Sequence, residues 1–470
     1  MAGRRNRVAA ALAAIVFTGT ALFGVVFAGW AGGSQGPGTN VRATGVPPRA
    51  ADDAAGTTVE WPVTRCGTYS GTGCAPTSAR VDLTRPTFSR PTEITNPLFP
   101  VSALDSVVLL GRVDGEVFRS ETTRIPGPHH VTVDGNQIEV VVSQYTAYRD
   151  GRIEEVAVDR YAQADDGSVW YLGEDVFDYR DGAVAVTEGT WLAGRDGPPA
   201  MIMPANPQPG DVFRAENVTG VVFEEITVDA VGQTVPGPRG PVTGAVVMRE
   251  LHLDGSVSNK VFAPGYGEFD TSSGGDVEAL AAAVPTDARE GAVPAELRLV
   301  STSAWGILEN VRLDDWEAAG PTAARLARLW AGLRPLGYPP RVTAMADRAV
   351  TTLSRAVARQ KVRTASQAAV DVAQSALDLE LLYRGSVDVD RFHLHAQNLR
   401  VHAAARDGAG VIAEVALLEW LRDRLAASLD ASLLSGLDDD LRALRGAADA
   451  GNLTAAADHA ARAAAALRRT

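Results

Sequence analysis

The chain has 470 residues, of which 46% are hydrophobic. It is longer than one compact core usually organises and too apolar for a disordered chain, so we expect two folded domains with appendages. The 57 acidic residues outnumber the 44 basic ones, which leaves a formal net charge of -13. This charge argues against general electrostatic contact with nucleic acid or anionic lipid, and we predict no nucleic-acid partner.

An export segment is predicted at residues 1–33. Arg4, Arg5 and Arg7 precede an apolar run over 8–33. Spanning a bilayer takes about 20 apolar residues, whereas a removable signal peptide has about 7 to 15, so the length favours an uncleaved membrane anchor. Small residues near the end of the run leave a cleaved signal peptide as the alternative. In both cases we expect the rest of the chain to be extracytoplasmic, either membrane-anchored or secreted.

Residues 34–82 are expected to form a tether, because much of this stretch is Gly, Pro, Ala, Ser and Thr and has little apolar surface to bury. Its two cysteines, Cys66 and Cys74, are the only thiols of the chain. An oxidising compartment would join them in a disulfide that stabilises the fold by about 2 to 3 kcal/mol. A metal or redox pair is the alternative, although the spacing is not that of a CxxC motif.

Asp-Gly pairs recur every 15 to 20 residues from Asp114 to Asp196 and lie within a β-rich domain predicted over 83–272. Asp-Gly is typical of tight hairpin turns, and the segments between the pairs are rich in Val, Ile, Thr, Tyr and Phe. We therefore expect about ten antiparallel strands in a meander that forms a sandwich or a partly open barrel. The candidate strands are 106–113, 116–125, 137–148, 152–163, 168–172, 176–180, 183–191, 212–218, 221–231, 243–253 and 256–262.

Beyond residue 272, Ala, Leu, Arg and Asp replace the β-branched residues, and apolar residues recur at three- and four-residue spacing. We interpret 273–315 as a connecting segment and 316–470 as a helical domain. Short connections imply antiparallel neighbours, hence an up-and-down bundle of about five to seven helices. The predicted fold class is α+β, with two domains. The candidate helices are 321–334, 341–362, 366–383, 390–406, 410–429, 437–447 and 453–468.

Three short motifs lie in the β-rich domain: Trp-Tyr-Leu-Gly-Glu-Asp at 170–175, Gly-Thr-Trp-Leu-Ala-Gly at 189–194 and Ile-Met-Pro-Ala-Asn-Pro at 202–207. Over about 96–270 the chain resembles a family of bacterial exported β-rich proteins of unassigned activity. The resemblance implies an exported β domain and supplies no catalytic residues. It does not extend to the helical domain.

Aromatic and acidic side chains gather around the first two of these motifs. Aromatic walls with a few placed carboxylates are typical of small-molecule sites, whereas the alternative is that the tryptophans fill a core and the carboxylates occupy a solvated turn. The same carboxylates raise the question of a calcium site, but an EF-hand loop is absent from the sequence. The candidate ligand-binding residues are Trp170, Tyr171, Glu174, Asp175 and Trp191.

A second pattern lies in the helical domain, where an antiparallel hairpin about Ser386 would pair His395 with Asp378 and His402 with Asp371. Seven residues separate the two pairs, or about 10 Å along a helix, which is too far for one dinuclear metal centre. The pairs are interpreted as interhelical hydrogen bonds, or alternatively as weak mononuclear sites for a transition metal.

Enzyme signatures give no positive support for catalysis. HExxH, the P-loop and paired CxxC motifs are absent from the sequence; the GxSxG match at 32–36 lies in the tether and the GxGxxA match at 408–413 follows a helix. We therefore predict a cell-envelope protein that binds a small molecule or an envelope protein, with no cofactor predicted. The alternatives are a hydrolase or metal-dependent enzyme that uses Glu174 and Asp175, and a metal-binding bundle centred on His395 and His402.

Overall fold

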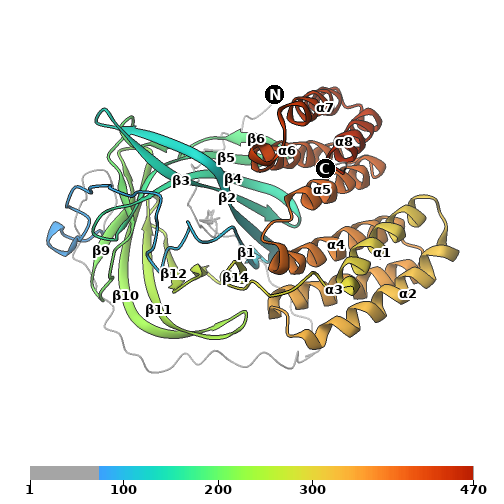
Figure 1. Cartoon of the computed structure of the whole chain (residues 1–470), viewed down its shortest axis with the longest axis horizontal. Helices are drawn as coiled ribbons and strands as arrows, with labels where there is room; N and C mark the ends of the chain where they lie inside the picture. The colour runs from blue at the N-terminus through green and yellow to red at the C-terminus, as the bar shows by residue number, and fades with distance from the viewer. Residues whose placement is uncertain (1–72, 469–470) are drawn as a thin grey trace, which may run out of the picture.

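The computed structural model describes residues 73–468 and shows a strongly curled β-sheet with a group of helices on one side of it (Figure 1). The predicted export segment and most of the tether lie outside the described residues. No helix in the described part of the chain is long and apolar enough to cross a membrane. The α+β architecture predicted from the sequence is confirmed.

The β domain is one open antiparallel sheet, and a sandwich is not formed. Its strands follow the order β6-β5-β4-β3-β2-β1-β14-β13-β12-β11-β10-β9, while β7 and β8 pair with β5 outside this path. The strands are β1 (Ser106–Val113), β2 (Glu116–Val133), β3 (Asn136–Arg149), β4 (Arg152–Gln163), β5 (Val169–Arg180), β6 (Ala183–Val186), β7 (Trp191–Leu192), β8 (Ala200–Met203), β9 (Val212–Val218), β10 (Val222–Gly237), β11 (Gly240–His252), β12 (Val257–Ala263), β13 (Gly267–Ser273) and β14 (Asp276–Val284).

Asp-Gly turns join four pairs of consecutive strands as predicted, whereas the Asp-Gly pair at Asp196 lies between β7 and β8, which pair with β5 and not with each other. Asp114, Asp134, Asp150 and Asp181 have φ between 47° and 54°, and each is followed by a glycine that also has positive φ. This backbone conformation matches the twist of the flanking strands, and Asp and Gly adopt it at low cost. The turns therefore fix the meander of β1 to β6 locally.

The sheet continues past the boundary expected at residue 272. β14 lies in the stretch interpreted as a connecting segment, and it pairs with β1 along its length, from Ser106 opposite Val284 to Arg112 opposite Val277. The last strand in the sequence of the domain, β14, therefore lies in the middle of the sheet, between β1 and β13. The predicted strands 168–172 and 176–180 are one strand, β5, which continues through Gly173.

The end of the predicted tether also packs on the sheet. The amide of Ala75 donates to Glu225 Oε1 at 2.6 Å, and Arg80 forms an isolated bridge with Val212. Cys74 is completely buried beside Phe223. Its expected partner Cys66 lies outside the described residues, so the disulfide stays a prediction.

The helical domain begins earlier than expected, because α1 lies in the segment 273–315. Two groups of four helices, α1–α4 and α5–α8, each enclose an apolar core. Polar caps start several helices: for example, Asp315 accepts from the amide of Ala318 before α2. The helices are α1 (Ala295–Arg312), α2 (Trp316–Leu333), α3 (Pro340–Ala358), α4 (Val362–Arg384), α5 (Asp388–Ala404), α6 (Gly408–Leu425), α7 (Ala431–Asp449) and α8 (Leu453–Leu467).

The two faces of the curled sheet have different surroundings. Side chains alternate along each strand, so Val108 and Leu110 of β1 share the core of the first helix group, while Leu109 points to the opposite, inner face. The helices cover the outer face, with α6 against β2 and β4 and with α3 and α4 against β14. The inner face is enclosed by the curl of the sheet and by the segment before β1, whose Phe99 packs against Tyr161 and Phe262.

Candidate functional site

Buried carboxylates line the inner face of the sheet. We call seven of them the acidic row, and each is at most 2% exposed. Carboxylates are rarely so deeply buried without a partner, because removing the ionised form from water is costly. The members of the acidic row are Asp159, Glu174, Glu216, Glu224, Glu250, Glu268 and Glu278.

The first part of the acidic row spans the two ends of the curled sheet. Trp191 pairs with Glu174 in the backbone ladder, and its Nε1 donates to Glu216 Oε1 of β9 at 3.0 Å. No amide, hydroxyl or ring N–H of residues 73–468 donates to either oxygen of Glu174. Burial, followed by the charge of Glu216, raises the pKa of Glu174 well above its usual range. This part of the row therefore has more acceptors than donors.

A second part combines two carboxylates with an imidazole. Glu224 of β10 lies directly opposite His252 of β11, and Glu250 lies two residues before His252 on the same strand face. One ligand atom from each of the three residues lies within 4.8 Å of the other two. We call these residues the Glu224–Glu250–His252 triad. Within residues 73–468 it is the one group of at least three metal-ligating side chains that meet so closely.

Two neighbours on β12 hold the triad in place. Ser258 Oγ donates to Glu250 Oε2 at 3.1 Å and lies 3.0 Å from His252 Nε2. Lys260 Nζ contacts the same oxygen of Glu250 at 2.9 Å. Burial opposes ionisation of Glu250, but the positive charges of Lys260 and His252 outweigh it and lower the pKa. Glu250 Oε1 accepts no hydrogen bond from the described residues.

The acidic row carries more negative charge than its basic neighbours balance. Among the buried basic side chains of residues 73–468, only Lys260 and His252 form ion pairs with it. Burial raises the pKa of Asp159 to about 7 despite hydrogen bonds from Tyr171 and Ser143. Burial likewise raises the pKa of Glu278 to about 7. Such a site holds either protons or an added cation.

The structure divides the candidate ligand-binding residues. Tyr171, Glu174 and Trp191 meet on the inner face, where Tyr171 donates to Asp159 at 3.0 Å. Tyr171 and Trp191 are completely buried, so both belong to the core. Alternation along β5 sends Asp175 to the other face, where it pairs with Arg160.

Trp170 lies apart from this inner group. Its Nε1 donates to Ser168 at 2.8 Å, and it borders a cleft of about 970 Å³ together with Met201 and Arg195. The five residues therefore do not form one ligand site. Glu216, Glu224, Glu250 and His252 were not predicted from the sequence, although Glu250 and His252 show the two-residue spacing of one strand face.

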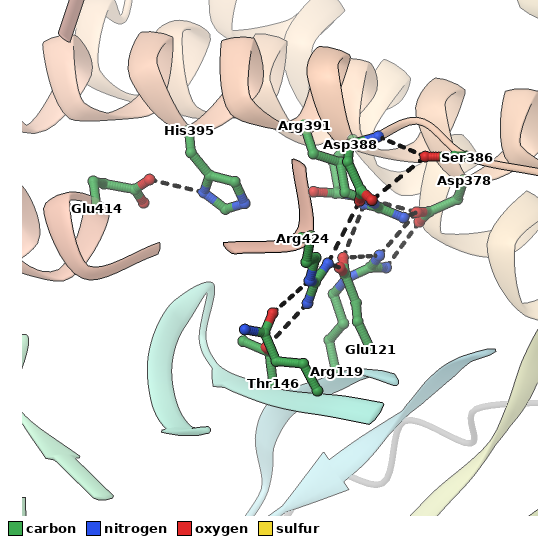
Figure 2. Close-up of polar contacts among 12 residues, drawn as sticks. Arg119, Glu121, Thr146, Asp378, Ser386, Asp388, Arg391, His395, Glu414 and Arg424 are labelled. Carbon is green, nitrogen blue, oxygen red and sulfur yellow. Dashed lines mark hydrogen bonds and ion pairs between the residues drawn. The ribbon is translucent and has the colours of Figure 1, made fainter. Parts of the chain in front are cut away.

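Charged groups are also buried on the outer face, where the sheet meets the helices (Figure 2). Arg119 of β2 donates to both oxygens of Asp378 of α4 at 2.8 Å, and to Glu121 at 2.7 Å. Arg391 of α5 contacts the same two carboxylates at 2.8 and 2.9 Å. Arg424 of α6 reaches Glu121 at 3.3 Å. We call these five residues the interdomain network.

The interdomain network is balanced in charge. Burial opposes the ionisation of Glu121, but Arg391, Arg119 and Arg424 outweigh it and lower its pKa far below the usual range. Asp388 lies 3.7 Å from Arg424 and adds a third carboxylate to the three guanidinium groups. The network joins β2 to α4, α5 and α6, and its partners are all supplied by the chain.

The predicted His395–Asp378 pair is not formed, since Asp378 is held by the interdomain network. His395 Nδ1 instead lies 2.8 Å from Glu414 of α6, and its ring stacks on Tyr148 of β3. His395 therefore helps to seat the helices on the sheet.

The predicted His402–Asp371 pair is not formed either. His402 Nδ1 lies 3.0 Å from Asp407 Oδ2, the residue that caps α6, while Asp371 borders the same pocket of about 620 Å³. A Cβ on Gly410, the central glycine of the GxGxxA match, would lie 2.3 Å from His402 Nδ1. Residues 408–413 therefore form the first turns of α6, where the backbone at Gly410 lies close to the ring of His402. The four bundle candidates for metal binding do not form a closely spaced group of three within the described residues.

Comparison with known proteins adds no family to this description. No protein-family model matches the chain, and no curated protein matches its sequence.

Proposed function

We propose that the chain is an extracytoplasmic protein of the cell envelope that binds a cation inside the curled sheet of its β domain. The observation that carries the proposal is the acidic row, in which seven buried carboxylates face only Lys260 and His252 as buried basic partners within residues 73–468. A bound cation offsets this excess charge. The apolar run at 8–33, preceded by arginines, supports the envelope location.

The packing around the acidic row favours a small ion over an organic ligand. Tyr171 stacks on Tyr161 with ring centroids 5.1 Å apart, and it meets Trp191 edge-on at 5.4 Å. All three aromatic side chains are completely buried. An organic ligand would have to displace this core, whereas an ion needs only the carboxylate oxygens that lack hydrogen-bond donors.

The pairing of Glu174 with Asp175 as hydrolytic acid and base receives no support from their positions. The two carboxylates project from opposite faces of β5, and Asp175 is held by Arg160. An acid and base acting on one substrate must both reach it, so this pair does not carry a second candidate function.

Cation binding is tested on the full-length chain after treatment with a chelator. Equilibrium dialysis against Mg²⁺, Ca²⁺, Mn²⁺ and Zn²⁺, followed by metal analysis, measures the bound ion, and thermal unfolding measures its effect on stability. We expect one of these ions to bind and to raise the melting temperature, because an ion that binds only the folded state stabilises it. If no ion binds and none changes the melting temperature, protons neutralise the acidic row and the proposal is wrong.

A further inference from the structure

The geometry points to a mononuclear site for a divalent transition metal, such as Zn²⁺, at the Glu224–Glu250–His252 triad. This inference rests on the proposed function, because it names the class of cation and the residues that bind it. A cluster of carboxylates alone would not distinguish a metal from protons. The imidazole, the spacing of the three side chains and their unused oxygens make that distinction.

The strand register brings the ligands together. Glu224 Oε1 lies 3.5 Å from His252 Nδ1, and one atom from each of the three side chains lies within 4.8 Å of the others. Ligand atoms that share a tetrahedral metal with bonds of about 2.0 to 2.2 Å are roughly 3.3 to 3.6 Å apart. The triad therefore needs side-chain adjustment but no change of backbone register to bind an ion.

Unused acceptors at the triad point to a ligand. Glu250 Oε1 accepts no hydrogen bond from residues 73–468, and Glu224 Oε1 has only the 3.5 Å contact with His252. Both side chains are at most 3% exposed, so bulk water does not replace the missing donors. Buried acceptors of this kind are uncommon unless water or an ion occupies the site.

The contacts on β12 orient the ligands. Ser258 and Lys260 both approach Glu250 Oε2, which leaves Oε1 of that carboxylate for an ion. Ser258 also lies 3.0 Å from His252 Nε2, so the other ring nitrogen, Nδ1, faces Glu224. A hydrogen-bond partner that orients metal ligands, as Ser258 does here, typically strengthens binding about 10- to 100-fold, whereas the charge of Lys260 opposes a cation.

The mixture of donors selects the metal class. An imidazole with two carboxylates suits Zn²⁺ and its first-row neighbours, whereas Ca²⁺ takes about six to eight oxygen ligands. Three protein ligands leave a coordination position for water. His252 ends β11 and is followed by the turn at Asp254 and Gly255, so the triad lies near the rim of the sheet.

The test compares triad variants with a variant of an exposed carboxylate on the same sheet, outside the acidic row. The full-length chain is stripped of metal, and Zn²⁺ affinity is measured by competition with a chromogenic chelator. We expect one Zn²⁺ per chain, a loss of about 100-fold or more in H252Q and E250Q, and a change of less than about threefold in E139Q, whose side chain is exposed on β3. Stripped variants are compared with the stripped parent chain by thermal unfolding, so that misfolding is recognised.

The metal ligands can also be identified in the unaltered chain, without substitutions that could affect folding. X-ray absorption of the Zn²⁺-loaded protein must show one imidazole and otherwise oxygen ligands; an all-oxygen shell or several imidazoles would overturn the assignment. Unchanged Zn²⁺ affinity in H252Q also overturns it, while the proposed function stands. If the unaltered chain binds no cation at all, the proposed function and this inference fail together.

Discussion

The two faces of the same sheet bury charge in opposite ways. On the outer face, the guanidinium groups of Arg119, Arg391 and Arg424 are matched by three carboxylates at 2.7 to 3.7 Å, those of Glu121, Asp378 and Asp388. On the inner face, the acidic row has only Lys260 and His252 as buried basic partners in the part of the chain that the structure describes. The outer charges are thus compensated within the chain, whereas the inner charges require something from outside it.

This difference separates a structural role from a binding role. A balanced buried network fixes how the helices sit on the sheet, and its loss is felt in stability. An unbalanced row lowers the stability of the protein that contains it, so its presence suggests another use. The following experiments test whether the two faces differ in this way.

The largest expected effect lies in the interdomain network. Arg391→Met removes a side chain that is 2% exposed and contacts both Glu121 and Asp378. The two carboxylates lose a shared partner while they remain buried, so we expect a loss of about 3 to 5 kcal/mol in the free energy of unfolding. Urea unfolding at neutral pH measures this loss.

An exposed ion pair provides the control for this substitution. Arg442 and Asp439 pair on the surface of α7, with side chains 72% and 67% exposed. Arg442→Met should change the free energy of unfolding by less than about 1 kcal/mol, because water and salt screen such pairs. Equal losses in the two variants would show that burial of the interdomain network adds nothing to its strength.

The opposite sign is expected in the acidic row. Glu174→Gln keeps the shape of the side chain and removes a carboxyl group whose pKa is raised by burial and by Glu216. We expect the metal-free variant to be more stable than the parent chain by roughly 1 to 3 kcal/mol at pH 7.5, since Glu174 must either bury its charge or take up a proton on folding, and both cost free energy. Urea unfolding in chelator measures the change; a clear destabilisation would mean that Glu174 is well compensated.

The two faces should also respond differently to pH. The pKa of Asp159 is raised to about 7 in the folded chain, so the folded state holds this proton where the unfolded state has lost it. Stability therefore falls as pH rises from about 4 to about 7, by on the order of 2 kcal/mol between pH 5 and 7.5 for this group. The lowered pKa of Glu121 acts in the other direction, and its contribution is lost only as pH falls below about 4.5.

This pH dependence is measured by urea unfolding of the chelator-treated chain between pH 5 and 8. Asp159→Asn removes the titrating group and should flatten the profile by the same amount. A parent chain that is as stable at pH 7.5 as at pH 5, with an unchanged profile in the variant, would contradict the raised pKa of Asp159.

The local part of the fold could be predicted from the sequence. The Asp-Gly turns and the three- to four-residue periodicity of the helices act within a few residues, and the corresponding hairpins and helices form. The pairing of β1 with β14 joins residues 106 and 284, and no local pattern encodes it. β5 was predicted as two strands, 168–172 and 176–180, but it continues through Gly173, where a Cβ would lie 2.4 Å from the carbonyl oxygen of Trp191.

The site was predicted less completely than the fold. Glu174 and Trp191 lie close in sequence, and their meeting with Tyr171 follows from that proximity. Glu216 and Glu224 join the site through the curl and register of strands far along the chain. In the helices, the expected His395–Asp378 pair does not form because Asp378 pairs with Arg119 of the sheet. The pattern of one helical hairpin contains no information about a partner on a distant strand.

The smallest effect is expected from removing the hydroxyl group of Tyr171, which contacts Asp159 of the acidic row. Its hydroxyl donates to Asp159 Oδ1 at 3.0 Å and favours the ionised carboxylate, so Tyr171→Phe should raise the pKa of Asp159 further. The cost of losing this bond is largest where Asp159 is ionised, because a hydrogen bond to a charged group is stronger than one to a neutral group. We expect a loss of about 1 to 2 kcal/mol at pH 8 and less than about 1 kcal/mol at pH 5, measured by urea unfolding in chelator. A loss of equal size at both pH values would mean that Tyr171 contributes through packing alone and does not tune the charge of Asp159.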